Sequence, residues 1–258
     1  MKQSSSPLSD AYEVIGHNNS SPFLFSCEHA SNFFPADIPV SSEDQAFKHT
    51  HWAWDIGVAE LLRQLVDHFC SQAIFSRFSR LIIDPNRDIR RSSLIPETIE
   101  GHALSFNQNL STDAIQDRLH RFYHPYHEAF SRMVKERCQN EAPFILISFH
   151  SFTPIWNSHL RTMDIGVLYE DYEDIAIQLK EAFERESFFV ALNEPYSGRN
   201  GLMYSVHQQG TRYNIPHLEL EISQFLLSSP ERVAYMAKKI ATALESFAEE
   251  YFPTKEDS

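Results

Sequence analysis

The segment FILISF at 144–149 constrains the fold more than any other part of the chain. Both alternate sets of its side chains are apolar, so a strand here has to be covered on its two faces. A strand of that kind belongs inside a parallel or mixed sheet with helices on both sides. Shorter apolar runs are expected to form further strands: Phe23–Cys27, Ala73–Phe75, Leu81–Ile83, Ile165–Tyr169, Phe188–Leu192 and His217–Ile222.

Apolar residues at steps of three and four predict helices between these strands. The spacing predicts one long helix over 43–69, on which His51 and Asp55 would be neighbours. A helical pattern over 112–139 contains Pro125, which is expected to break or kink it. Two more helices are predicted over 173–185 and 230–250. This alternation predicts an α/β fold, a three-layer α/β/α arrangement with a central mixed, mostly parallel sheet.

Length and composition favour one compact domain. The chain has 258 residues, of which 42% are hydrophobic, and its 20 Phe supply material for a large core. Glycine is scarce at 7 residues, and no stretch has the composition of a flexible linker. We expect residues 1–20, which are polar, to be a loosely ordered N-terminal lead-in, and residues 21–258 to form a single domain.

Charge and cysteine content exclude several classes of protein. The formal net charge of −13 makes nucleic acid a poor partner, because phosphate backbones are repelled. The 3 cysteines form no CxxC pair and no disulfide framework, which fits a reducing compartment. There is no signal peptide pattern and no apolar run near the ~20 residues of a membrane span. We expect a soluble, cytoplasmic protein with no membrane partner; the sequence does not indicate its oligomeric state.

Polar clusters follow three predicted strands, at the edge where ligands gather in such sheets. They are Glu28-His29, Asp84-Pro85-Asn86-Arg87 and His150-Ser151. His29 and His150 would meet there, with Asp55 and Glu221 also available. Imidazole and carboxylate suit Zn²⁺, which in catalytic sites has three protein ligands and a water. The pKa of that water falls to about 7, so hydroxide is available at neutral pH.

Charged side chains near the same edge indicate how a substrate could be bound. Arg80 and Arg87, in company with Asn86, would form a fork for a substrate carboxylate. Glu219 and Glu221 alternate with apolar residues and therefore share one face of a strand. Two acids buried there are costly without a partner, and metal-site chemistry is one reason to keep them.

Two other nucleophiles stand at these positions, a cysteine and a serine. Cys27 could act as a nucleophile, but at the end of an apolar strand it is more often a small buried residue. Ser151 follows His150 without a GxSxG elbow, which argues against a serine hydrolase. Two readings besides the metal hydrolase stay open: a metal-independent thiol amidase that uses Cys27, and a catalytically idle protein that binds an acidic ligand.

Seven segments in order, covering nearly the whole chain from residue 23 to 250, resemble the N-formylglutamate amidohydrolase family. They are CEHASNFFP (27–35), HWAWDIGVAELL (51–62), SRLIIDPNRD (79–88), HPYHEAF (124–130), SFHSFTP (148–154), NEPYSG (193–198) and HLELEISQFLL (217–227). The resemblance implies a fold similar to the zinc carboxypeptidases. It also implies hydrolysis of the C–N amide bond in a small acidic N-acyl amino acid, with N-formyl-L-glutamate as the reference substrate.

The resemblance also implies roles for particular residues and a cofactor, one Zn²⁺ or another divalent metal per chain. The metal ligands would be His29, Asp55 and His150. Glu221 would be the general base, with Arg80 and Glu219 beside it as catalytic residues. The substrate would be bound by Asn86, Arg87, Tyr196, Ser197, Gly198 and Arg212, and one of the arginines would support the oxyanion. The chain departs from the HxxE pair of carboxypeptidases, because Asn32 stands where the glutamate would be.

Overall fold

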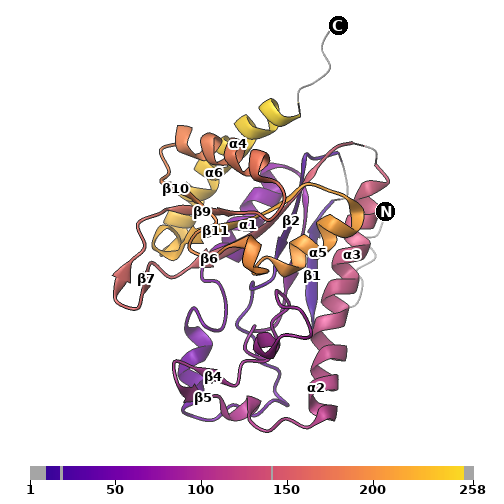
Figure 1. The fold of residues 1–258 in the computed structure, drawn as a ribbon, viewed down its shortest axis with the longest axis vertical. Coiled ribbons are helices and arrows are strands. Elements are labelled where there is room, and N and C mark those ends of the chain that lie inside the picture. The colour runs from indigo at the N-terminus through magenta and orange to yellow at the C-terminus, as the bar shows by residue number, and fades with distance from the viewer. Residues whose placement is uncertain (1–9, 18–19, 141, 253–258) are drawn as a thin grey trace, which may run out of the picture.

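The computed structural model describes residues 10–17, 20–140 and 142–252. A 7-stranded sheet runs through its centre in the order β1-β3-β2-β6-β11-β9-β10 (Figure 1). The strands are β1 (Tyr12–Gly16), β2 (Phe23–Cys27), β3 (Gln72–Ser76), β6 (Ile145–Phe152), β9 (Ile165–Leu168), β10 (Val190–Leu192) and β11 (His217–Ser223). Four neighbouring pairs are parallel, and the pairs β1–β3 and β9–β11 are antiparallel. The predicted mixed, mostly parallel sheet is confirmed.

Helices cover both faces of the sheet, as the three-layer prediction requires. The helices are α1 (Val58–His68), α2 (Thr112–Arg118), α3 (His124–Cys138), α4 (Glu173–Arg185), α5 (Tyr204–Tyr213) and α6 (Pro230–Tyr251). Apolar residues of α1, α4 and α6 pack with Ile145, Ile147 and Phe149 on one face. Apolar residues of α3 and α5 pack with Leu146 on the other. The strand β6 is therefore covered on both faces, for the reason that its sequence indicated.

The segment 43–69 is not one long helix, so that prediction is wrong. A 3-10 helix covers Asp44–His49, turns follow, and α1 begins only at Val58. Gly57 precedes α1 with a left-handed φ of 81°, and a Cβ there would lie 2.6 Å from the Cβ of Leu227. The turns carry Asp55 to the loop after β2, where its backbone N–H donates to the carbonyl of His29 at 2.9 Å.

Two other predictions are corrected by the sheet itself. Leu81–Ile83 is buried but forms a turn, in which the N–H of Ile82 donates to the carbonyl of Ser79. No strand position is open for it beside β3, because β1 and β2 already pair with the two edges of β3. Tyr12–Gly16, expected within the loosely ordered lead-in, forms β1 of the sheet. Residues 1–9, 18 and 19 of the predicted lead-in lie outside the described residues.

Smaller elements complete the described chain. They are 3-10 helices at Ser92–Leu94, Ser105–Asn107, Gly198–Asn200 and Gln224–Leu227, a π-helical turn at Leu119–Tyr123, and the short strands β4 (Thr98–Ile99), β5 (His102–Ala103), β7 (Ile155–Trp156) and β8 (His159–Leu160). The π-helical turn separates α2 from α3 just before Pro125, which confirms the predicted break near this proline. In the described part of the chain, no helix has the length and apolar character to cross a membrane.

Arg118, at the end of α2, is buried and joins two loops. Its guanidinium donates to the carbonyl of Ile82 at 2.8 Å and to Asn107 Oδ1 and the carbonyl of Phe106, both at 2.6 Å. Burial lowers the pKa of Arg118 to about 10, and it stays charged at neutral pH. These contacts fix the loop that continues into Asp84.

We expect Arg118→Met to lower the free energy of unfolding by about 2–4 kcal/mol, because three buried acceptors lose their donor. The measurement is the urea midpoint, read by circular dichroism. Arg185→Met is the matched control: Arg185 pairs with Glu250 on the surface, where an ion pair contributes about 0–1 kcal/mol. Equal midpoints for the two variants would contradict the structural role of Arg118.

Candidate active site

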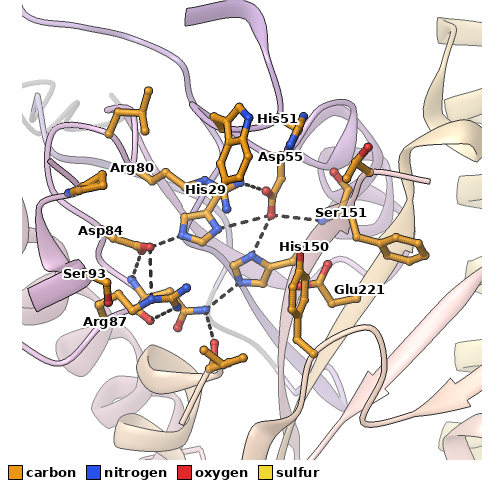
Figure 2. Close-up of a pocket in the computed structure, with 18 of the residues that line it drawn as sticks. His29, His51, Asp55, Arg80, Asp84, Arg87, Ser93, His150, Ser151 and Glu221 are labelled. Carbon is orange, nitrogen blue, oxygen red and sulfur yellow. Dashed lines mark hydrogen bonds and ion pairs between the residues drawn. The ribbon is translucent and has the colours of Figure 1, made fainter. Parts of the chain in front are cut away.

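Two histidines and an aspartate converge at the carboxyl ends of the parallel strands (Figure 2). His29 follows β2, His150 lies near the end of β6, and Asp55 comes from the turns before α1. All three side chains are buried, and one ligand atom from each lies within 4.8 Å of the others. We call these three residues the ligand cluster. Histidine and carboxylate in this number are a donor set that suits Zn²⁺.

The two histidines are oriented in the same way. Each directs Nδ1 at Asp55 Oδ2, at 3.5 Å from His29 and 2.8 Å from His150. Each directs Nε2 at other carboxylates: His29 at Asp84, 2.7 Å away, and His150 at Glu28 and Glu219, 3.0 and 3.4 Å away. A carboxylate that holds one ring nitrogen leaves the other free to coordinate a metal, as in known metal sites. His29 Nδ1 is buried without a hydrogen-bond partner among the described residues, which fits such a role.

The charges of these groups depend on their neighbours. Burial, reinforced by the charge of Arg80, lowers the pKa of His29 to about 3. Burial also opposes the charged form of His150, but the carboxylates of Glu219 and Glu28 outweigh it and raise its pKa to about 9. The hydrogen bond and charge of His150 in turn overcome burial at Glu28 and lower its pKa to about 2. His29 is therefore neutral, while His150 lies in an anionic environment.

Arg80 fixes the orientation of Asp55. Its Nη2 contacts Asp55 Oδ1, so Oδ2 is left to face the histidines and to accept from the N–H of Ser151 at 3.1 Å. Arg80 Nε is buried and donates to none of the described residues. Arg80 also borders the cavity described below.

Glu219 and Glu221 lie on β11, the strand next to β6, and both are buried. Glu219 accepts from Asn86 Nδ2 at 3.2 Å and faces His150. Glu221 Oε2, in contrast, has no hydrogen-bond partner in the described part of the chain. Burial raises the pKa of Glu221 above the ordinary range, against the opposing charge of His150. Glu221 Oε2 is thus free to accept a proton, beside the ligand cluster.

A cavity of about 330 Å³ opens over the ligand cluster. It brings together nine of the twelve predicted site residues: His29, Asp55, Arg80, Asn86, Arg87, His150, Tyr196, Glu219 and Glu221. In Figure 2, Arg87 and Ser93 lie on one side of the two histidines, and Ser151 and Glu221 lie on the other. A pocket with a few converging polar groups and shifted pKa values is the usual form of an active site.

Asn86 and Arg87 differ in how far their side chains are already hydrogen-bonded within the protein. The amide of Asn86 is engaged by the protein, since Nδ2 donates to the carbonyl of Leu202 at 3.1 Å and Oδ1 accepts from the N–H of Ser205 at 2.9 Å. Arg87 donates through Nη1 to the carbonyl of Asn86 at 2.9 Å, its Nε lies 3.8 Å from Asp84 Oδ2, and its side chain borders the cavity. Asn86 therefore holds the site together, and Arg87 can contact a ligand.

Three predicted substrate residues lie elsewhere. Arg212, on α5, lines a separate surface pocket with Arg132 and Lys135. Ser197 and Gly198 do not border the cavity, and the backbone of Gly198 packs so closely on Tyr169 that a Cβ would lie 2.5 Å from its carbonyl oxygen. Gly198 is thus a packing residue, and Tyr196 alone of this loop's predicted residues reaches the cavity.

The thiol of Cys27 is not placed to act as a nucleophile. Its side chain is fully buried in β2 and does not border the cavity. Burial, with the nearby charge of Glu28, raises its pKa well above the ordinary value, whereas a reactive cysteine needs an accessible thiolate. The burial of Cys27 therefore argues against the thiol amidase interpretation.

Several residues of the site were not predicted. Glu28 and Asp84 orient the two histidines, and both stand inside motifs that pointed to the site. The sequence offered no sign of which imidazole nitrogen each would hold. His51, Trp52 and Trp156 also line the cavity, although tryptophans in such a sequence usually belong to the core.

The fold and the site can be compared with known proteins. A family model described as N-formylglutamate amidohydrolase matches residues 21–228. A solved gene product from Agrobacterium tumefaciens is 25% identical, with 93% of this chain and 96% of that chain covered and a TM-score of 0.81. N-formylglutamate amidohydrolase from Ralstonia eutropha JMP134 shares the fold at 18% identity, with 94% and 98% covered and a TM-score of 0.72. The curated proteins contain no match.

The family match covers the loops that carry the ligand cluster, the cavity and both glutamates of β11. It agrees with the resemblance of the seven sequence segments. The chain therefore belongs to the N-formylglutamate amidohydrolase family, whose reaction is the hydrolysis of an amide bond.

Proposed function

We propose that this protein is a metal-dependent amidohydrolase that acts on a small acidic N-acyl amino acid similar to N-formyl-L-glutamate. The products would be the free amino acid and formate, or the acid of another acyl group. The observation that carries the proposal is the ligand cluster, in which two Nδ1 atoms and one carboxylate oxygen converge while other carboxylates hold both Nε2 atoms. Glu221, buried beside the cluster, supports hydrolysis rather than binding alone.

The residues present fit one Zn²⁺ or a similar divalent metal. His29, Asp55 and His150 would hold it, and the orphaned Nδ1 of His29 is the atom that most needs such a partner. When bound, the metal would polarise the acyl oxygen and lower the pKa of water. A proton competes with the metal for His150, so metal binding is expected to release protons and to weaken at low pH.

Glu221 would move the proton during the reaction. As water attacks the acyl carbon, the carboxylate of Glu221 accepts the proton that the water loses. It then returns this proton to the amide nitrogen, so that the C–N bond breaks and a neutral amine leaves. Arg80 borders the cavity, and its Nε has no hydrogen-bond partner among the described residues. Arg80 would donate to the oxygen that gains negative charge.

Arg87 would bind the carboxylate of the substrate, because it borders the cavity and its planar guanidinium matches a carboxylate. We expect Arg87→Lys to lower kcat/KM by about 10- to 100-fold, mainly through KM, because a point charge replaces a planar fork. Steady-state kinetics with N-formyl-L-glutamate measures this. Arg90→Lys is the control, since Arg90 pairs on the surface with Asp88. An unchanged KM in Arg87→Lys would contradict the assignment.

The proposal is tested by following release of free glutamate from N-formyl-L-glutamate by untagged protein with zinc. We expect turnover, and at least about 10-fold lower kcat/KM for N-formyl-L-leucine, which lacks the second carboxylate. Binding of N-formyl-L-glutamate without any turnover would instead support the idle binding protein. Equal rates for the two compounds would overturn the acidic substrate class.

A further inference from the structure

One part of the cavity is lined by aromatic side chains. Trp52, Phe152, Trp156 and Tyr196 border it, and we call these four residues the aromatic wall. The ring centroids of Trp52 and Trp156 lie 5.4 Å apart, although the two residues come from separate parts of the chain. Trp156 belongs to the short hairpin β7–β8 and is 36% exposed. Aromatic rings gathered at a cavity offer a flat apolar surface to a ligand.

Arg161 contacts three of the four rings of the aromatic wall. Its guanidinium lies over Phe152, Trp156 and Tyr196, at 5.7, 5.4 and 5.2 Å from their ring centroids. It also donates to the carbonyl of Thr153 at 3.2 Å. Cation–π contacts with three rings fix their relative positions before any ligand arrives. The wall is therefore a preformed surface, which reduces the entropy lost when a ligand binds.

The wall borders the same cavity as Arg87 and the ligand cluster. In Figure 2, Arg87 is on one side of His29 and His150, and Ser151 is on the other. Phe152 continues the chain from Ser151 and begins the wall. A substrate whose carboxylate contacts Arg87 and whose acyl carbon lies at the ligand cluster would therefore extend its acyl group toward the aromatic rings.

A formyl group carries only a hydrogen on its carbonyl carbon, so it has no side group to pack on this surface. The cavity of about 330 Å³ falls in the range of about 300–1,000 Å³ that holds drug-sized ligands. N-formyl-L-glutamate is much smaller than such ligands and would leave the wall uncovered. His51, whose ring packs on Trp52 at 4.8 Å, also has a buried Nε2 with no partner among the described residues. This nitrogen would suit a polar substituent on a larger acyl group.

We infer that the aromatic wall is the acyl subsite, and that the preferred substrate is an acidic amino acid carrying an aromatic acyl group instead of formyl. This inference rests on the proposed function and names the substrate class of the same site. The acyl ring would pack on Trp156 and Trp52 while the amide lies at the ligand cluster. A single methylene in an apolar pocket changes specificity by about 10- to 200-fold, so a whole ring has a large effect.

The test compares kcat/KM for N-formyl-, N-acetyl- and N-benzoyl-L-glutamate with zinc-loaded protein. We expect the benzoyl compound to exceed the formyl compound by at least about 10-fold in the wild type. Trp156→Ala should lower this benzoyl-to-formyl ratio by at least about 10-fold, and Trp156→Leu, which keeps apolar volume without the ring, should lower it as well. Leu160→Ala is the matched control: Leu160 lies on the same hairpin, is 69% exposed and is not among the residues that line the cavity. It should leave the ratio unchanged.

A wild type that prefers the formyl compound, or a ratio that Trp156→Ala leaves unchanged, would overturn the inference. Absence of turnover with all three compounds would instead mean failure of the proposed function. In that case isothermal titration calorimetry tests, without turnover, whether the aromatic wall binds the acyl group. Binding of N-benzoyl-L-glutamate at least about 10-fold tighter than N-formyl-L-glutamate, lost in Trp156→Ala, supports it, and equal affinities contradict it.

Discussion

Glu221→Gln is expected to lower kcat by at least about 100-fold while zinc stays bound. The amide side chain keeps the size of Glu221 but cannot accept and return a proton, and general acid–base catalysis contributes about 10²- to 10⁴-fold. Because burial raises the pKa of Glu221, kcat/KM of the wild type should fall as the pH is lowered through that pKa and the carboxylate becomes protonated. The residual activity of the variant should lack this loss at low pH.

The matched comparison for this variant is Glu219→Gln, two residues earlier on the same strand. Glu219 faces His150 Nε2 and accepts from Asn86, so it orients a metal ligand. Its replacement should therefore weaken zinc binding by about 10- to 100-fold. Zinc affinity and kcat at saturating zinc are measured for both variants. Normal turnover in Glu221→Gln, or the same kcat loss in both, would mean that Glu221 is not the base.

His150→Ala is expected to abolish stoichiometric zinc binding. His150 supplies one of the two imidazoles of the ligand cluster, and a site left with His29 and Asp55 has too few protein ligands for a catalytic zinc. Elemental analysis of untagged protein after zinc loading and dialysis should give near one zinc per wild-type chain and almost none in the variant.

His127→Ala controls for the loss of a buried histidine nearby. His127 lies on α3, its Nε2 donates to the carbonyl of Pro85 at 3.0 Å, and its side chain does not border the cavity. It should keep the wild-type zinc content. If both variants keep their zinc, His150 is not a metal ligand.

The sheet and most helices could be predicted because local patterns decide them. The apolar character of β6 on both faces required cover on both sides, and α4 spans the predicted 173–185. His29 and His150 could be placed together for a related reason. Parallel strands end at one edge of a sheet, so residues at their carboxyl ends meet whatever their separation in sequence.

The errors arose where distant contacts override local pattern. Leu81–Ile83 is as apolar as a strand, but the edges of β3 are already paired, and this segment packs as a buried turn instead. His51 and Asp55 matched helical spacing, whereas the left-handed Gly57 and the hydrogen bond from Asp55 to His29 hold this segment in turns. Asp55 reaches the ligand cluster by that route and not from a helix.

The orientation of the side chains in the site could not be predicted from the sequence. Which nitrogen of His29 faces Asp84, and which oxygen of Asp55 contacts Arg80, depend on three-dimensional packing. The motifs nevertheless contained these residues. Trp156 stands outside the motifs, and its position at the cavity depends on a short hairpin of two-residue strands.

The most direct test of the central claim is the rate of glutamate release from N-acyl-L-glutamates by metal-free protein titrated with zinc. A chelator removes the metal first, and formyl, acetyl and benzoyl compounds serve as substrates. We predict that activity is lost with the metal and returns in proportion to added zinc until about one zinc per chain is bound. Full activity in the metal-free protein, or no activity at any zinc concentration, would contradict metal-dependent hydrolysis at the ligand cluster.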